Sequence, residues 1–303
     1  MSNALLVDLG GSSCRVGLAE NGILEPGSRQ SYANAEFDSL EDILQTYLKA
    51  RFADVSQICA GIAGPVKEST AQLTNHAWFV DGPALSRRLG ADQTFLMNDL
   101  QAQAYALDDL KQTDVTTLIA AQPDPDGPRM TLCLGTGCNI AVAHRRGAHV
   151  FVPPSESGHM SLPDAPEFRA LYDVVRREVP HLPIESFLSG PGLSRLHSLL
   201  TGATRTSSEI VSAKPDTTLD TFARLLGKAA GNLALSHMAT GGVYLIGGLA
   251  RAIAPHLVSH GFLAPFCDRG PYADIMARIP IHVVTDDSAA LLGCARYLRQ
   301  MGV

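Results

Sequence analysis

The sequence predicts an α/β protein built as two lobes, each opened by a strand, a glycine turn and a second strand. Ala4 to Leu9 is an apolar run that ends at Gly10-Gly11, and a second apolar strand follows from Arg15 to Ala19. The same order returns at Met130 to Leu134, Gly135-Thr136-Gly137 and Asn139 to His144. A chain of 303 residues is also at the size where one hydrophobic core usually divides into two. Two related halves are therefore expected.

The first lobe continues from its hairpin in an α/β order. Asp38 and Glu41 form a capping-box pattern that predicts the start of a helix. The apolar residues of that helix recur at helical spacing: Leu40, Ile43, Leu44, Tyr47 and Leu48. Strands are predicted at about 57 to 63 and 94 to 98, and a helix from Asp99 to about Leu107 completes the lobe.

The second lobe begins after a segment from Lys111 to Arg129, whose prolines and glycine predict a crossing loop. Its later elements are a helix from Asp164 to about Arg177 with Glu167 in capping position, a helix at 219–239, a strand at Val243 to Ile246 that ends at Gly247-Gly248, a strand at Ile281 to Val284, and a closing helix from Ser288 to Met301. We expect a small lobe of residues 1–109 plus 286–303 and a large lobe of residues 110–285, with the site in the cleft between them.

Composition excludes several classes of function. The net charge is -6 and basic residues cluster only in pairs, so the footprint of a nucleic-acid-binding protein is missing. No apolar run approaches the roughly 18 residues of a membrane helix, and the N-terminus has no signal-peptide pattern. The six cysteines form no metal-ligand spacing, which favours reduced thiols in a reducing compartment. We expect a cytoplasmic protein with no nucleic-acid or membrane partner.

Three strands that end in glycine turns are typical of a protein that wraps backbone N–H groups around phosphates. A single turn of this kind is more often a tight connection without a ligand, but three at strand ends favour phosphate binding. Neither a P-loop nor a dinucleotide-binding glycine motif opens a helix here, which leaves the actin-like ATPase architecture. Asp8, just before Gly10, could hold Mg²⁺ through a bound water.

An ordered set of motifs carries a resemblance to a known family. They are Asp8-Leu9-Gly10-Gly11-Ser12, Leu73 to Trp78 (LTNHAW), Asn98-Asp99, Gly135-Thr136-Gly137, Glu156-Ser157-Gly158-His159, Glu185 before Leu188 to Leu193 (LSGPGL), and Gly241 to Gly248 (GGVYLIGG). With this set the chain resembles, over nearly its whole length, the bacterial glucokinase family of the hexokinase, actin and Hsp70-like superfold. The resemblance implies a two-lobed actin-like ATPase (ribonuclease H-like) fold with an inter-lobe cleft.

The resemblance also implies an activity, namely transfer of the γ-phosphoryl group of MgATP to the C6 hydroxyl of glucose by a homodimer. It assigns sugar contacts to Asn75, Asn98, Asp99, Glu156, His159 and Glu185, and nucleotide contacts to Asp8, Gly10, Gly11, Ser12, Gly135, Thr136, Gly137, Gly247 and Gly248. Asp99 is the expected general base, since a primary hydroxyl must lose its proton as it attacks the phosphoryl group. An aspartate that starts a helix more often caps it, and Asp99 could do both.

Departures from the family pattern keep other functions open. Ser13, Ser157 and Asn139 stand where Asn, Gly and Gly are common in the family, so the substrate could be another hexose or an amino sugar. A catalytically silent sugar sensor is the alternative from another class of protein. No cysteine-rich zinc segment of the kind found in the repressor/open-reading-frame/kinase (ROK) group follows His159.

Overall fold

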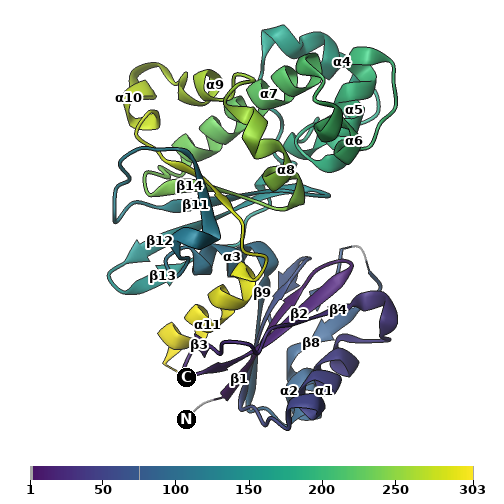
Figure 1. The fold of residues 1–303 in the computed structure, drawn as a ribbon, viewed down its shortest axis with the longest axis vertical. Coiled ribbons are helices and arrows are strands. Elements are labelled where there is room, and N and C mark those ends of the chain that lie inside the picture. The colour runs from purple at the N-terminus through teal and green to yellow at the C-terminus, as the bar shows by residue number, and fades with distance from the viewer. Residues whose placement is uncertain (1–2, 75, 303) are drawn as a thin grey trace. The chain divides into compact units, whose positions relative to one another are not determined.

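The computed structural model describes residues 3–74 and 76–302, and its contacts divide the chain into two compact units (Figure 1). Unit 1 comprises the described residues of Met1–Lys111, Arg146–Pro154 and Asp286–Val303, and unit 2 comprises Gln112–Arg145 and Ser155–Thr285. None of the helices within residues 3–74 and 76–302 has the length and apolar character needed to cross a bilayer.

Unit 1 is built on a sheet with the strand order β3-β2-β1-β5-β9, in which β4 also pairs with β2. The strands are β1 (Asn3–Leu9), β2 (Ser13–Glu20), β3 (Ile23–Leu24), β4 (Gln30–Ala33), β5 (Gln57–Ile62) and β9 (Gln93–Asn98). The predicted hairpin is present, with β1 and β2 antiparallel, while β5 and β9 continue the sheet in parallel. Parallel strands end at one edge, so Leu9, Ile62 and Asn98 lie in register there.

Helices cover both faces of this sheet, with α1 (Leu40–Arg51) and α2 (Gly82–Leu89) on one side and α3 (Asp99–Ala106) and α11 (Ala289–Met301) on the other (Figure 1). The cap of α1 differs from the prediction by one residue. Ser39 is the N-cap, because its side chain accepts a hydrogen bond from the amide of Asp42. Asp38 does not cap the helix.

The remaining elements of unit 1 are short. They are η1 (Asn34–Glu36), a small sheet of β6 (Val66–Lys67), β7 (Thr70–Gln72) and β8 (Phe79–Asp81), and β13 (His149–Phe151). Segment 146–154 groups with unit 1, although the sequence placed it in the large lobe. Gln300 exchanges two hydrogen bonds with the backbone of Val150, and Gln101 Nε2 donates to Val152 O at 2.8 Å. These side-chain bonds attach the segment to α11 and α3.

Unit 2 contains a second sheet in which β10, β15, β14, β11 and β12 are neighbours in that order. The strands are β10 (Val115–Ile119), β11 (Arg129–Leu134), β12 (Cys138–Arg146), β14 (Gly242–Ile246) and β15 (Ile281–Val284). The glycine-turn hairpin β11–β12 is antiparallel, as in unit 1, and β14 and β15 run parallel to β11. β10 lies in the stretch predicted as a loop. It is a partly exposed edge strand, so its sequence lacks the apolar run that marks a buried strand.

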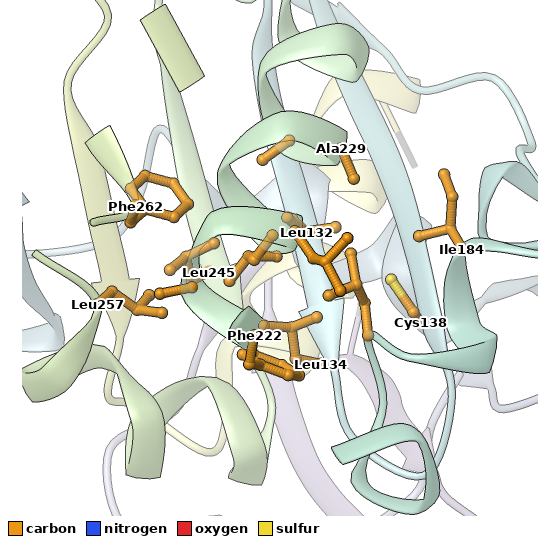
Figure 2. Packing of buried hydrophobic residues seen from close by; sticks show 14 of the residues in the cluster. Leu132, Leu134, Cys138, Ile184, Phe222, Ala229, Leu245, Leu257 and Phe262 are labelled. Carbon is orange, nitrogen blue, oxygen red and sulfur yellow. The ribbon is translucent and has the colours of Figure 1, made fainter. Parts of the chain in front are cut away.

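The labelled helices of unit 2, α4 to α10, lie on one side of its sheet (Figure 1). The helical elements of this unit are η2 (Gln112–Asp114), η3 (Ser157–His159), η4 (Pro166–Phe168), α4 (Arg169–Arg176), η5 (Ile184–Ser186), α5 (Gly190–Thr201), α6 (Ser207–Ala213), α7 (Asp216–Ser236), α8 (Gly248–Leu257), α9 (Leu263–Cys267), η6 (Gly270–Tyr272) and α10 (Ala273–Met276). Figure 2 shows their core, where Phe222 of α7 packs with Leu134 of β11. The helix predicted at 164–177 is shorter in the structure, where α4 begins only at Arg169. Glu167 lies in the preceding η4 and does not cap α4; its carboxylate pairs with Arg224 at 3.6 Å.

Candidate active site

The opening hairpin of unit 1 places an acid beside the first glycine turn. Asp8 is the partner of Arg15 in the β1–β2 register, and Arg15 Nη1 lies 3.1 Å from Asp8 Oδ2. The turn itself is fixed by a hydrogen bond from Gly10 N to Ser13 O at 2.9 Å and by Asn34. Asn34 donates from Nδ2 to Gly10 O and from its amide to Ser12 O, which sets the orientation of the peptide groups at this turn.

Asp8 is almost completely buried, and burial raises the pKa of its carboxyl above the ordinary value of 3.8. The charge of Arg15 and its hydrogen bond oppose this rise, while the charge of Asp287 adds to it. Asp287 follows the last strand and thus brings a second carboxylate near Asp8. Carboxylate oxygens are the hard ligands that Mg²⁺ prefers, so the donor set at this turn fits that ion.

Asn98 and Asp99 lie where β9 ends and α3 begins. Asn98 is the N-cap, since its Oδ1 accepts from Leu100 N and Gln101 Oε1 accepts from Asn98 N in a capping box. Asn98 Nδ2 also donates to Gly64 O at 3.2 Å. Asp99 is the first residue of the helix, and its Oδ1 accepts from Leu100 N at 2.8 Å. Asn98 therefore holds the N-cap position, and Asp99 shares the amide of Leu100 with it.

The second glycine turn, in unit 2, connects β11 to β12. Gly135 N donates to Gly137 O at 3.0 Å, and Gly190 N, at the start of α5, donates to Gly135 O at 2.7 Å. A Cβ at Gly137 would lie 3.2 Å from Glu185 Oε2, whereas one at Gly135 would meet nothing within 4 Å. The hydroxyl-bearing residues of the two turns, Ser12 and Thr136, are both exposed. The bonds from Gly135 N and Gly190 N therefore fix the backbone of the turn, and the space beside the Cα of Gly135 is free of protein atoms.

The third turn assigns different roles to its two glycines. Gly247 has φ +105°, and a Cβ there would overlap the carbonyl of Leu134, so packing against β11 requires glycine at this position. Gly248 begins α8, and a Cβ there would meet nothing within 4 Å. Open space at Gly248, at the start of a ten-residue helix, suits the approach of an anion.

Three further predicted sugar-binding residues, Glu156, His159 and Glu185, lie in unit 2. His159 Nδ1 is 3.6 Å from Glu185 Oε1, and η3 brings His159 back toward Glu156 through a bond from His159 N to Glu156 O at 3.1 Å. Glu156 is exposed, and its Oε2 accepts a hydrogen bond from Asn139 Nδ2 at 3.0 Å. Unit 2 therefore groups two carboxylates and an imidazole next to the second glycine turn.

The predicted residues thus form one set in each unit. Unit 1 holds Asp8, Gly10, Gly11, Ser12, Asn98 and Asp99, while unit 2 holds Gly135, Thr136, Gly137, Glu156, His159, Glu185, Gly247 and Gly248. Asn75 lies outside the described residues.

Three residues near these sets were not predicted. The partner of Asp8, Arg15, could have been found by counting the hairpin register, but Asp287 is too distant in the chain. In the sequence, Asn139 stands out only as a departure from the family pattern.

Comparison with known proteins tests the resemblance directly. A family model described as Glucokinase matches residues 5–301. The glucokinase of Yersinia pestis (strain Pestoides F) is 31% identical over 311 residues, which cover 98% of this chain and 96% of that protein. A solved glucokinase from an Antarctic psychrotroph is 28% identical, with a TM-score of 0.86 over 99% of both chains.

More distant solved structures share the fold. A glucokinase from Balamuthia mandrillaris in complex with glucose is 18% identical and has a TM-score of 0.77, covering 99% of this chain and 94% of that one. A ROK family glucokinase from Streptomyces griseus in complex with glucose and AMPPNP is 17% identical with a TM-score of 0.66, covering 99% and 100%. The predicted two-lobed actin-like ATPase fold is confirmed, and the chain belongs to the glucokinase family.

Proposed function

We propose that this protein is an ATP-dependent glucokinase that transfers the γ-phosphoryl group of MgATP to the C6 hydroxyl of glucose, with Asp99 as the general base. Membership of the glucokinase family over almost the whole chain supports the reaction class. The observation that supports the role of Asp99 is its place directly after β9, where Asn98 is the N-cap of α3 and Asp99 Oδ1 accepts from the adjacent amide of Leu100. A carboxylate at a strand end is suited to accept the proton of the attacking hydroxyl.

Recognition of the sugar would come from Asn98, Asp99 and Asn75 together with Glu156, His159 and Glu185. Carboxylates accept hydrogen bonds, asparagine donates and accepts, and histidine does either, so this set can read several hydroxyl groups at once. A site that pairs each of these groups rejects a sugar that leaves one of them buried without a partner.

The nucleotide would be bound by the three glycine turns, with Gly135 and Gly248 as the positions where the backbone is open to a phosphate. Asp8 is the residue proposed to hold Mg²⁺ through water, with Asp287 as a second carboxylate near it. When bound, Mg²⁺ neutralises charge on the β- and γ-phosphate oxygens. Arg15 keeps the buried carboxylate of Asp8 paired and in place.

Two further parts of the proposal rest on the family resemblance and on the thiols. We propose a homodimer, which sedimentation equilibrium of the purified protein tests. We also propose that the enzyme acts in the cytoplasm, where all six cysteines, none of which forms a disulfide in the structure, would stay reduced.

The experiment that tests the function is ADP release from MgATP with glucose, mannose, fructose, glucosamine, N-acetylglucosamine or no sugar. Glucose-dependent release of ADP supports the proposal. Faster release with another sugar would mean that this sugar is the preferred substrate of the same phosphoryl transfer. Asp99→Asn should abolish release. Asp81→Asn is the matched control, because Asp81 caps α2 in the same unit through a bond from Ala84 N, and it should leave turnover unchanged. Saturable sugar binding without any ADP release would instead indicate a silent sensor.

A further inference from the structure

Asn139, the second residue of β12, uses the full hydrogen-bonding capacity of its side chain on its neighbours. Its Nδ2 donates to Ser155 O at 2.8 Å and to Glu156 Oε2 at 3.0 Å. Its Oδ1 accepts from Ile140 N at 2.8 Å and from Gly158 N at 3.4 Å. A primary amide has two N–H donors and two lone pairs, so each has a partner here. The side chain therefore fastens segment 155–158 to the strand.

Close backbone packing holds the same segment. A Cβ at Gly158 would overlap Cys138 O, so the segment lies directly on the first residue of β12 and only glycine fits there. Ser157 supports the loop from within, because its Oγ is 2.8 Å from Ser155 Oγ and its amide donates to that same oxygen at 3.3 Å. Ser157 and Asn139, both departures from the family pattern, thus take part in one arrangement that fixes the loop carrying Glu156.

The start of β12 also lies at the second glycine turn. Gly137, two residues before Asn139, approaches Glu185, whose carboxylate is close to His159. Glu156 is held by Asn139 itself. One short stretch of chain, 137–139, therefore connects the proposed phosphate-binding turn to the proposed sugar-binding carboxylates.

We propose that Asn139 is a positioning residue for hexose recognition, which holds Glu156 Oε2 so that the other carboxylate oxygen is aimed before the sugar binds. This proposal rests on the proposed function, because Glu156 must contact the sugar for its orientation to matter. Binding to groups that are already oriented avoids the cost of ordering them, so loss of Asn139 should appear mainly as weaker and less selective sugar binding.

The informative substitution is Asn139→Asp. It retains an oxygen that can accept from Ile140 N and Gly158 N, and it replaces the donor to Glu156 with a second negative charge. We expect KM for glucose to rise about tenfold, as the loss of one hydrogen bond to a charged group implies, while KM for ATP changes less than about twofold. The ratio of kcat/KM for glucose to that for mannose and for glucosamine should fall.

Asn232→Asp is the matched control, since it makes the same chemical change at an exposed position of α7 in unit 2, and it should leave all parameters unchanged. Melting temperatures of all variants are measured alongside. If Asn139→Asp is not folded, Asn139→Ala, which removes the donor without adding charge, supports the same comparison.

The decisive readout is a double-mutant cycle with Glu156→Gln. If Asn139 acts through Glu156, Asn139→Asp should raise the glucose KM less than about twofold in the Glu156→Gln background. Equal increases in the KM of both substrates, a fall in kcat alone, or an undiminished effect in that background would overturn the proposal. Wild-type turnover with glucose is measured in the same assay, so failure of the proposed function is seen separately as an inactive wild type.

Discussion

Arg15 Nη1 lies 3.1 Å from Asp8 Oδ2, and the two residues are direct partners across the opening hairpin of unit 1. The pair does not fully compensate the burial of Asp8, because the pKa of Asp8 remains above its ordinary value. The ionised carboxylate therefore opposes folding at neutral pH. A buried carboxylate with a raised pKa is typical of a functional site, where its charge serves to bind a ligand although it costs stability.

We predict that Asp8→Asn abolishes activity while the melting temperature at pH 7.5 stays at or above that of the wild type. A carboxyl whose folded pKa is raised contributes stability at pH below the unfolded value of 3.8, and that contribution is lost as pH rises. Asparagine removes the charge, and the expected loss of turnover is roughly 100-fold or more. Thermal unfolding and ADP release measure the two effects. A marked fall in melting temperature would mean that the pair with Arg15 stabilises the fold overall.

The Gly248→Ala variant should bind ATP more weakly while the stability of the folded protein is retained. A Cβ at Gly248 would meet no protein atom within 4 Å, and alanine is a better helix former than glycine, so stability should be kept. If a phosphate approaches this backbone, KM for ATP should rise roughly tenfold, the loss of about one charged hydrogen bond. Steady-state kinetics with varied ATP give the result.

Gly247→Ala is the contrasting variant at the neighbouring position. Its φ of +105° and its approach to Leu134 predict a loss of about 1–3 kcal/mol or more in the free energy of unfolding. Urea denaturation measures this loss.

For the Gly248→Ala variant, the contrary result is an unchanged KM for ATP, which would remove α8 from the proposed nucleotide site.

Gly293→Ala should destabilise unit 1, because a Cβ at this position of α11 would overlap the carbonyl of Ala102 in α3. Overpacking of this kind costs about 1–3 kcal/mol, more than the helical preference for alanine returns. Chemical denaturation gives the loss, and Gly248→Ala, the same exchange in open space, is its control. Wild-type stability of Gly293→Ala would show that the two helices separate without cost.

Stability should fall as pH drops below about 6.5, and His282 should account for part of that fall. Burial, and then the charge of Arg129, lower the pKa of His282 below its ordinary value of 6.5. The unfolded chain therefore takes up the proton first, so stability present above pH 6.5 is lost as pH decreases. His237, whose pKa burial also lowers, acts in the same direction.

The test for His282 compares melting temperatures at pH 7.5 and 5.5 in the wild type and in His282→Gln. Glutamine keeps a polar group near Thr117 Oγ1, to which His282 Nδ1 is bonded at 3.1 Å, but does not titrate. The variant should lose less stability on acidification than the wild type. Equal losses in both proteins would assign the acid sensitivity to other groups.

Local patterns predicted the elements that are buried and missed those that are not. The apolar runs at Ala4 to Leu9 and Met130 to Leu134 became β1 and β11, because buried strands need continuous apolar residues. β10 was missed since its residues are partly exposed. The cap of α1 was assigned one residue early because Asp38 and Ser39 are both good caps, and only backbone geometry decides between them.

The residues of the candidate site that belong to short sequence motifs could be predicted. Asn98-Asp99 and the glycine turns stand together in the sequence, and family resemblance extended this to Glu156, His159 and Glu185. The hydrogen bonds of Asn139 join residues that are 16 to 19 positions apart, so they depend on how η3 folds back onto β12. Asp287 comes near Asp8 only through the fold of unit 1. No local pattern encodes such contacts.

The packing of α11 on α3 has a consequence for the order in which the enzyme is made. The helix that begins with Asp99 leaves the ribosome early, whereas Gly293, which lies on its backbone, is translated long afterwards. Until then α3 has no helix beside it, and the buried face of β1 and β5 that α11 covers is open to water. A stalled or C-terminally shortened chain would thus carry every proposed catalytic residue and still leave the apolar surface of α3, β1 and β5 without the helix that covers it.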